Sequence, residues 1–272
     1  MDYSVLMPVY YKENPEYFKE SIESMLSQTV PTDNFVIVCD GELTDELTKV
    51  LDTYRNNPVI TIVQLEKNMG LAKALTEGLK YCKNELVARM DSDDISLPER
   101  CKKQLEIFSA ENIDVVGSNV LEFIDDADNA LSIRCVPETH EKIKIYAKKR
   151  NPMNHPSVMF KKSLVIKNGC YQNFRLYEDY QLWVKMIING CKFKNIQEPL
   201  VKMRTTNDLY MRRGGLKYFK NGCALQSYMY KSGYISAVRY IKNLIERFMV
   251  QVLMPNHIRK WFYLRVLRED KK

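Results

Sequence analysis

Three aspartates, Asp91, Asp93 and Asp94, lie within four positions directly after the apolar run 86–90. Carboxylates at this spacing repel one another, so the cluster favours a divalent cation or a ligand rich in hydrogen-bond donors. The run before them has the length and apolar character of a buried strand, and open α/β sheets bind ligands at the carboxyl ends of their strands. The pattern predicts a metal or ligand site there. The alternative is a solvated turn, in which Asp and Ser are common.

Predicted strands and helices alternate through the first part of the chain and determine where these acids lie. Asn14 and Pro15 open the first helix as an N-cap followed by a proline in the first helical turn. The alternation predicts an α/β fold with a mostly parallel central sheet, helices on both faces, and a site on the loops after the strands. The strands are predicted at 4–10, 35–39, 59–65 and 86–91, and the helices at 14–28, 44–55 and 70–81.

Polar and aromatic residues gather in the loops after these strands. A carboxylate such as Asp40 can accept the N3 proton of a pyrimidine, and the ring of Tyr10 or Tyr11 can stack on the base. Gly70 would let the backbone approach a ligand, and Lys73 could offset phosphate charge. Each is also an ordinary turn or cap residue, but turns alone do not easily explain such residues at four successive strand ends. The loops therefore predict a nucleotide site.

A second acidic pair, Glu178 and Asp179, lies far along the chain. The apolar residues from 182 to 187 repeat at helical spacing, so the pair occupies a helix start, where the helix dipole favours acids. An acidic first turn is common without any function, and that alternative stays open. His155 precedes another predicted strand at 158–160. It has no Cys or His at ligand spacing, so a buried structural histidine is favoured over a metal ligand.

The composition describes a globular protein of a reducing compartment. The chain has 272 residues, 45% of them apolar, which suits one substantial domain with an appendage or two small domains. Its seven cysteines are scattered without a CxxC pair, which favours free thiols over disulfides or a zinc site. The amino terminus lacks the basic and apolar regions of a signal peptide, so we expect a cytoplasmic protein.

The net charge of +7 resides in the last 42 residues. Residues 1–230 contain 31 basic and 31 acidic side chains, whereas 231–272 contain 10 basic and 3 acidic. Between Ile235 and Leu267 basic residues are interleaved with apolar ones, broken once by Pro255, and no apolar stretch is long enough to span a bilayer. The segment predicts two amphipathic basic helices on an anionic membrane surface; the alternatives are a helical hairpin covering the body or a homodimer contact. No nucleic-acid module accompanies the basic residues, so we expect no nucleic-acid partner.

Six motifs occur in order along the chain: Met7-Pro8-Val9-Tyr10 with Glu13, Asp40-Gly41, Asn68-Met69-Gly70-Leu71-Ala72, Ala88-Arg89-Met90-Asp91-Ser92-Asp93-Asp94, His155-Pro156-Ser157, and Glu178-Asp179-Tyr180 with Trp183. Taken together, they resemble those of bacterial family 2 glycosyltransferases with the GT-A fold, and the likeness covers residues 4 to about 216. One departure follows Val201: the family often has Tyr-Arg and then a histidine, where this chain has Met203-Arg204-Thr205-Thr206-Asn207. The pair Arg212-Arg213 could substitute for the histidine, or could belong to a solvated loop.

The resemblance implies a reaction and a role for each motif. A sugar would pass from a nucleotide-sugar donor to a hydroxyl group with inversion at the anomeric carbon, and Asp179 would be the general base. Asp93, with Asp91, would bind Mn²⁺ or Mg²⁺, Asp91 would also lie by the ribose and diphosphate of the donor, and Asp40 would hold uracil. This agrees with the chemistry, since inversion needs a base opposite the leaving diphosphate and a cation to neutralise it. Further donor-side candidates are Pro8, Val9, Tyr10, Glu13, Asn68, Lys73, Arg89 and Ser92; acceptor- or diphosphate-side candidates are His155, Glu178, Trp183, Arg212 and Arg213.

We therefore expect a metal-dependent hexosyltransferase that extends a lipid-linked saccharide for capsule, exopolysaccharide or O-antigen, attached peripherally to the cytoplasmic face of the membrane. Its GT-A domain would cover 1–230, with a nucleotide-binding half at 1–94 and an acceptor-binding half at 95–230, followed by the extension 231–272. Two alternatives are considered. A sugar nucleotidylyltransferase would have a Gly-rich basic loop after the first strand, which 10–14 lacks. The intact Asp91, Asp93 and Asp179 disfavour a non-catalytic binding module.

Overall fold

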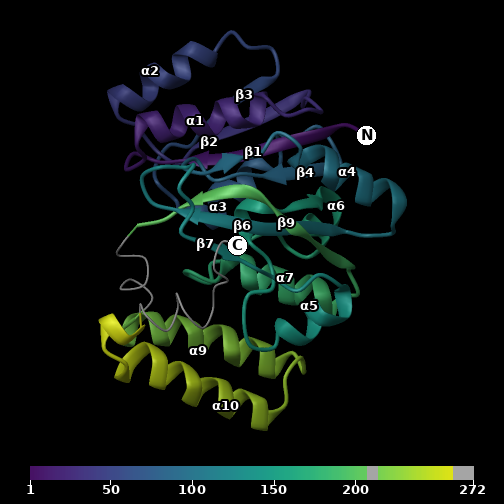
Figure 1. Cartoon of the computed structure of the whole chain (residues 1–272), viewed down its shortest axis with the longest axis vertical. Coiled ribbons are helices and arrows are strands. Elements are labelled where there is room, and N and C mark those ends of the chain that lie inside the picture. Colours follow the sequence, from purple (N-terminus) through teal and green to yellow (C-terminus); the bar gives the residue numbers. More distant parts are fainter. Residues whose placement is uncertain (207–213, 260–272) are drawn as a thin grey trace.

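Four parallel strands form the amino-terminal half of the central sheet, in the order β3-β2-β1-β4 (Figure 1). The computed structural model describes residues 1–206 and 214–259. Parallel pairing of β1 with β2 and β4, and of β2 with β3, brings the carboxyl ends of all four strands to one edge, as the sequence predicts. The bounds are β1 Tyr3–Val9, β2 Asn34–Cys39, β3 Ile60–Gln64 and β4 Leu86–Arg89.

The other half of the sheet is mixed rather than parallel. β8 runs antiparallel to both β4 and β6, whereas β6 and β9 are parallel to each other. The predicted parallel pairing therefore holds for the first four strands and for β6 with β9, whereas β8, β5 and β7 pair antiparallel with their neighbours. The short helix η1 (His155–Ser157) directly precedes β8, and the Arg89 amide donates to the Val158 carbonyl at 2.9 Å, which brings this segment beside β4. The sheet continues from β4 through β8 (Met159–Lys161), β6 (Val115–Phe123), β9 (Phe193–Arg204) and β5 (Ile95–Ser96), with β7 (Ser132–Arg134) paired to β6.

Helices cover both faces of the sheet, and alternate strand residues enter two separate cores. Val5 and Met7 of β1 belong to the core under α1 (Pro15–Leu26), α2 (Asp45–Tyr54) and α4 (Arg100–Ala110). Leu6 enters the opposite core, as the period of two in a strand requires. Asn14 caps α1, as predicted, by accepting from the amides of Glu16 and Tyr17. The second core lies under α3 (Leu71–Gly78), α5 (His140–Tyr146), α6 (Lys162–Lys167), α7 (Glu178–Ile188) and α9 (Leu216–Lys231).

The helices α9 and α10 (Ala237–Phe248) pack against each other at one end of the molecule and form the α9–α10 hairpin, residues 216–248 (Figure 1). The chain continues from α10 into the π-helical turns η2 (Met249–Leu253) and leaves the helix before Pro255, as predicted. The domain boundary predicted after Tyr230 falls in the last turn of α9, and the helix predicted beyond Pro255 extends into 260–272, outside the described residues. No helix within 1–206 and 214–259 is long and apolar enough to cross a bilayer.

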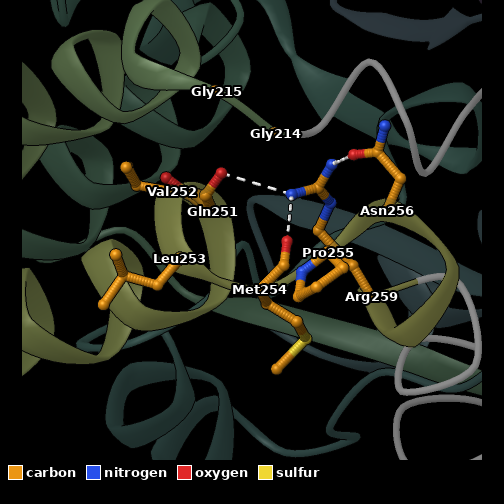
Figure 2. A pocket seen from close by; sticks show the side chains of 9 residues that line it. All are labelled: Gly214, Gly215, Gln251, Val252, Leu253, Met254, Pro255, Asn256 and Arg259. Atoms are coloured by element: carbon orange, nitrogen blue, oxygen red, sulfur yellow. Dashed lines mark hydrogen bonds between the residues drawn. The ribbon is translucent and has the colours of Figure 1, made fainter.

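Arg259 fixes the chain after η2. Its guanidinium donates to the carbonyl oxygens of Gln251 and Met254, each at 3.2 Å, and contacts the Asn256 side chain (Figure 2). These residues line a hollow of about 480 Å³. A Cβ at Gly214 would lie 2.1 Å from the Arg259 guanidinium, so a larger residue there would require the Arg259 side chain to shift.

Candidate active site

Asp40 follows β2 and organises the loop after β3. Its carboxylate oxygens accept hydrogen bonds from the backbone amides of Met69 (2.7 Å) and Gly70 (2.9 Å). Gly41 has a φ of 88°, and a Cβ there would lie 2.5 Å from the Asn68 nitrogen, so glycine is required. The structure thus brings the Asp40-Gly41 and Asn68–Gly70 motifs together. Each Asp40 oxygen retains a lone pair for a further donor, such as the N3–H of a pyrimidine.

Three predicted donor-side residues lie in the segments that follow β1 and β3, at the same edge of the sheet. Tyr10 and Tyr11 are 43% and 47% exposed, with ring centroids 5.8 Å apart in a T-shaped arrangement. They offer an accessible aromatic surface to a base. Lys73 lies in the first turn of α3 and pairs with Glu77 at 2.7 Å, so a phosphate group would compete with that carboxylate for the ammonium.

Glu13 connects the first loop to the acidic cluster. Its Oε2 accepts a hydrogen bond from the Ser92 hydroxyl at 2.6 Å, and its Oε1 accepts one from the Asn14 amide at 2.9 Å. Pro8 and Val9, also predicted on the donor side, are buried in β1. Their contribution is therefore to hold the loop that follows them.

Arg89, the last residue of β4, is a buried cation that pairs with the first acid of the cluster. Its side chain is 1% exposed and donates to both carboxylate oxygens of Asp91, one of them at 2.6 Å. Paired hydrogen bonds between a guanidinium and a carboxylate are stronger than single ones and fix the orientation of both groups. Asp91 is therefore held in one direction by a neighbour two residues away.

Asp93 and Asp94 complete a group of three carboxylates. One oxygen from each of Asp91, Asp93 and Asp94 lies within 4.8 Å of the others. Burial, together with the negative charges of Asp91 and Glu13, raises the pKa of Asp93 to about 7. Burial, followed by the charge of Asp93, raises the pKa of Asp94 well above its usual value. A nearby cation would relieve this repulsion.

The oxygens of this group fit a hard divalent cation. Carboxylates are ligands that Mg²⁺ and Mn²⁺ prefer. Asp94 Oδ1 accepts a hydrogen bond from the Arg204 amide at 2.8 Å, whereas the buried Oδ2 has no hydrogen-bond partner among the described residues. The Asp93 carboxylate lies beside it, while both oxygens of Asp91 already accept from Arg89. Asp93 and Asp94 Oδ2 therefore offer the more available oxygens.

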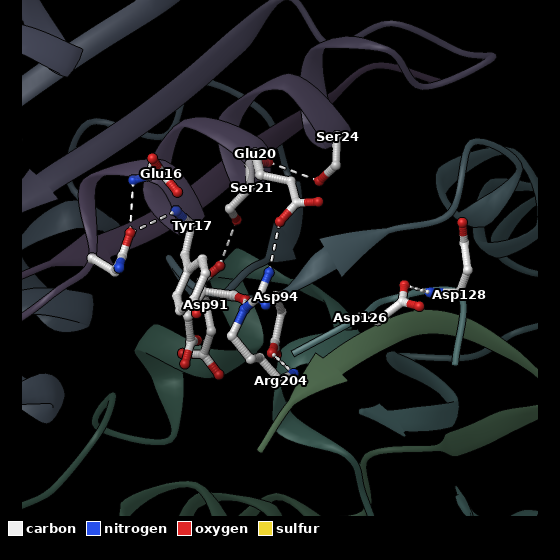
Figure 3. Close-up of polar contacts among 12 residues, drawn as sticks. Glu16, Tyr17, Glu20, Ser21, Ser24, Asp91, Asp94, Asp126, Asp128 and Arg204 are labelled. Atoms are coloured by element: carbon white, nitrogen blue, oxygen red, sulfur yellow. Dashed lines mark hydrogen bonds and ion pairs between the residues drawn. The ribbon is translucent and has the colours of Figure 1, made fainter. Parts of the chain in front are cut away.

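Arg204 is a site residue that the sequence analysis did not single out (Figure 3). The residue ends β9, and its guanidinium lies 3.6 Å from the Tyr17 ring centroid and 4.5 Å from that of Phe123. Its Nε donates to the Asp93 carbonyl at 3.0 Å, and its Nη2 donates to Glu20 at 2.6 Å. Arg204 therefore ties the acidic loop to α1 and β9. Its place in the Met203-Arg204 segment, compared above with Tyr-Arg of the family, was the one sequence signal, and nothing indicated its contact with Asp93, 111 positions away.

Asp179 lies in the first turn of α7, as predicted, and is oriented by a neighbouring amide. Its Oδ2 accepts a hydrogen bond from the Asn151 side chain at 2.5 Å. Burial raises the pKa of Asp179, although the Asn151 hydrogen bond acts in the opposite direction. Burial also raises the pKa of the adjacent Glu178. A carboxylate with a raised pKa accepts a proton more readily, which suits a general base.

His155 packs into an aromatic cluster beside α7. Its Nε2 lies 3.1 Å from the Tyr171 hydroxyl, and its ring centroid lies 6.0 Å from that of Trp183. Burial, together with the charge of Arg89, lowers the pKa of His155 well below its usual value, so the ring is neutral near pH 7. These contacts favour the structural interpretation of His155. Trp183 is fully buried, so it can affect an acceptor only through its neighbours.

Arg89 connects the acidic cluster to Asp179. Burial dominates the pKa values of Asp93 and Asp179 and raises both, while the Arg89 charge lowers both. Two acidic groups from distant segments therefore lie within the influence of one buried cation. Arg212 and Arg213, predicted as possible substitutes for a histidine, lie outside the described residues.

The chain matches known proteins along most of its length. The profile described as glycosyl transferase family 2 matches residues 4–169. A UDP-Gal:alpha-D-GlcNAc-diphosphoundecaprenol beta-1,3-galactosyltransferase from Escherichia coli is 40% identical over 267 residues, which cover 98% of this chain and 96% of the relative. The amylovoran biosynthesis glycosyltransferase AmsE from Erwinia amylovora is 36% identical over 267 residues, which cover 96% of this chain and 97% of the relative.

A solved structure shares the fold. The crystal structure of residues 1–349 of S. aureus TarS in complex with UDP-GlcNAc superposes with a TM-score of 0.68 at 20% identity, covering 98% of this chain and 76% of that one. At this identity the likeness concerns the fold alone. It confirms the GT-A class expected from the sequence motifs.

Proposed function

Because the chain belongs to glycosyl transferase family 2, we propose that it transfers a hexose from a UDP-sugar to a hydroxyl group of a lipid-linked saccharide, with inversion at the anomeric carbon. The observation that carries the proposal is the 40% identity, over 98% of this chain, with an enzyme named for a UDP-Gal donor and a GlcNAc-diphosphoundecaprenol acceptor. The similarity to AmsE, named for amylovoran biosynthesis, supports a role in cell-surface polysaccharide synthesis.

The donor would lie along the edge formed by the ends of β1 to β4. Asp40 would accept the N3–H of uracil on the lone pairs left by its two backbone contacts, and Tyr10 or Tyr11 would stack on the base. The diphosphate would lie beside the acidic cluster. Mn²⁺ or Mg²⁺, held there by Asp93 with Asp91 or Asp94, would neutralise the charge that develops on the leaving diphosphate.

Asp179 would act as the general base on the acceptor side. It would take the proton from the acceptor hydroxyl while that oxygen attacks the anomeric carbon and the bond to the diphosphate breaks on the opposite face. Asn151 would keep the carboxylate turned toward the acceptor through the hydrogen bond to Oδ2. The products are the extended lipid-linked saccharide and UDP, and the proton leaves Asp179 for solvent.

The proposed acceptor places the reaction at a membrane. A lipid-linked saccharide stays in the bilayer, whereas a nucleotide sugar is dissolved in water, so the enzyme must work at their boundary. We extend the proposal to peripheral attachment at the cytoplasmic face. The excess of 10 basic over 3 acidic residues in 231–272 supports attraction to anionic lipid.

A transfer assay with the full-length protein tests the proposal. The protein is incubated with a panel of nucleotide sugars and a synthetic GlcNAc-diphospho-lipid acceptor, in Mn²⁺, in Mg²⁺ and in excess chelator. We expect transfer from a UDP-hexose, release of one UDP per sugar, a β-linkage by NMR from an α-linked donor, and no turnover in chelator.

Each part of the proposal can fail separately in this assay. Turnover in excess chelator would contradict the metal assignment, and an α-linked product would contradict inversion. Release of pyrophosphate from a nucleoside triphosphate and a sugar phosphate would instead support a nucleotidylyltransferase. Donor binding without transfer or hydrolysis of any sugar in the panel would support a binding module.

A further inference from the structure

One side of α10 is apolar and exposed. Positions 238, 241, 245 and 248 follow one another at intervals of three or four, and Met249, the first residue of η2, lies four positions after Ile245, so together they form a continuous stripe. Exposed apolar surfaces of this extent mark interaction sites in soluble domains. The residues, named here the α10 stripe, are Val238 (78% exposed), Ile241 (56%), Ile245 (59%), Phe248 (38%) and Met249 (52%).

The opposite side of α10 holds the helix on the body of the protein. Asn243 is 2% exposed and donates from Nδ2 to the Lys148 carbonyl (2.8 Å) and to the Gln226 side chain (2.7 Å). Arg247 donates to the Lys149 carbonyl at 3.2 Å. These contacts fix the rotation of the helix about its own axis. Because these contacts hold the opposite side of the helix against the body, the α10 stripe faces away from it.

The surroundings of the α10 stripe are basic. Residues 214–259 contain seven Lys or Arg side chains; Arg259 is buried and Arg247 faces the body, which leaves five, and the one acidic side chain of this range, Glu246, pairs with Lys149 at 3.0 Å. Lys242 is exposed and directly follows the stripe residue Ile241 in the sequence. An apolar stripe flanked by basic residues is typical of helices that lie in the interface of an anionic bilayer. A second copy of this chain would bring two basic surfaces together, which like-charge repulsion opposes.

We propose that the α10 stripe docks the protein on the surface of an anionic lipid bilayer. This inference rests on the membrane location proposed above and assigns it a surface. The side chains of the stripe enter the boundary between headgroups and acyl chains, while Lys242 and the other basic residues of the hairpin contact anionic headgroups.

The docking helix also contacts the segment that carries Asp179. Arg247 Nη1 lies 3.4 Å from the hydroxyl of Tyr177, and Tyr177 immediately precedes α7, whose first two residues are Glu178 and Asp179. The hairpin forms one end of the long axis of the molecule, with α2 at the other end (Figure 1). Docking through the α10 stripe would hold the start of α7 at a defined height above the bilayer, where a lipid-linked sugar is presented.

Cosedimentation with lipid vesicles tests this surface. The full chain is mixed with vesicles of phosphatidylcholine alone, or of phosphatidylcholine with phosphatidylglycerol, at low and high salt. We expect binding to the anionic vesicles that high salt weakens. The double variant Ile241→Glu/Ile245→Glu should lose about tenfold or more in apparent affinity. Ile166→Glu is the matched control, since Ile166 is 51% exposed on α6, outside the hairpin, and should bind like the wild type.

Point substitutions are more informative than removal of 235–272, because Ile235 and Asn243 are buried against the body. Thermal unfolding by circular dichroism and acceptor-independent hydrolysis of the donor check that the double variant keeps its fold and its donor site. If the wild type neither hydrolyses nor transfers any sugar, the proposed function is contradicted, and vesicle binding stands as an independent result.

Three outcomes would overturn the docking proposal. The wild type could ignore anionic vesicles, or the double variant could bind them as well as the Ile166→Glu control. Light scattering could instead show a dimer that the double variant converts to a monomer, without vesicle binding by either protein. That last result would assign the α10 stripe to a second copy of the chain.

Discussion

Replacing Asp179 with Asn tests the chemical step most directly, because the change removes a proton acceptor and little else. Asn has nearly the shape of Asp, and its side-chain oxygen can still accept the hydrogen bond that Asn151 donates at 2.5 Å. The first turn of α7 loses a favourable negative charge, worth about 0.3–1 kcal/mol. It also loses the cost of a buried carboxylate, which is the reason that the pKa of Asp179 is raised. We therefore expect a folded protein of nearly unchanged stability.

The expected loss of activity follows from the role of a general base. Such a base contributes about 10²–10⁴-fold to a rate, or about 2.7–5.4 kcal/mol of transition-state stabilisation. Asp179→Asn should lower kcat by this factor and leave KM for the nucleotide sugar nearly unchanged, because the donor site lies on the loops after β1 to β4. Steady-state kinetics of UDP release, with the lipid-linked acceptor saturating, measures both quantities.

The pH profile gives a second measure of the same assignment. The base must be ionised, so kcat should fall as the pH drops through the raised pKa of Asp179. The hydrogen bond from Asn151 lowers that pKa, so Asn151→Ala should move the acidic limb of the profile to higher pH. The limb should disappear from the residual activity of Asp179→Asn.

Glu178→Gln is the matched control for Asp179→Asn. Glu178 is adjacent, precedes Asp179 in the first turn of α7 and also has a pKa raised by burial. Glu178→Gln should lower kcat by less than about tenfold. If Glu178→Gln proves the more damaging change, or if Asp179→Asn keeps wild-type kcat, the assignment of the base is wrong.

Three further predictions concern the acidic loop and His155. Asp93→Asn should abolish Mn²⁺-dependent turnover and weaken donor binding while the melting temperature stays close to that of the wild type; turnover and calorimetric donor titration measure this. Arg204→Met should lower the free energy of unfolding by about 2–4 kcal/mol, since it removes a buried cation–π contact and two charge-assisted hydrogen bonds. The control is Lys202→Met, because the ion-pair partner of Lys202 is 92% exposed; it should lower that free energy by less than about 1 kcal/mol, and urea titrations measure both. Burial places the pKa of His155 below the unfolded value of about 6.5, so the unfolded chain binds a proton that the folded chain does not. The free energy of unfolding should therefore be highest above pH 6.5 and should fall by about 1 kcal/mol by pH 5.5. His155→Gln should remove that part of the pH dependence, and equal slopes in both proteins would contradict it.

The part of the site built on the first four strands was predictable because its geometry is local. Each strand ends in a polar loop, and parallel pairing brings the ends to one edge regardless of the details of packing. Asp40 and Asp91 were placed correctly at this edge for that reason. The pair Arg89 and Asp91 was also readable in principle, since residues two apart in an extended segment point to the same side.

The remaining contacts depend on packing between distant segments and left no pattern in the sequence. Arg204 reaches Asp94 only because β9 pairs with the two-residue strand β5, which is too short to show a periodicity. The insertion of β8 antiparallel between β4 and β6 could not be inferred from a three-residue strand. Asn151, which orients Asp179, lies in an irregular segment without any motif. Contacts between distant segments position these residues, and the intrinsic secondary-structure propensity of the sequence does not indicate them.

The two acidic groups of the site are positioned by different parts of the fold. We therefore expect one part to affect donor binding and the other to affect the approach of the acceptor. The acidic loop after β4 is fixed by α1 and β9 through Arg204, within the half of the molecule that carries the donor loops. The start of α7 is fixed by Asn151 and, through Tyr177 and Arg247, by the helix that carries the exposed apolar stripe. We infer that substitutions in the hairpin change how the acceptor meets Asp179 before they change how the donor binds. An Arg247→Met variant should therefore raise KM for a lipid-linked acceptor more than KM for the nucleotide sugar; an equal rise in both would show that the hairpin acts on the fold as a whole.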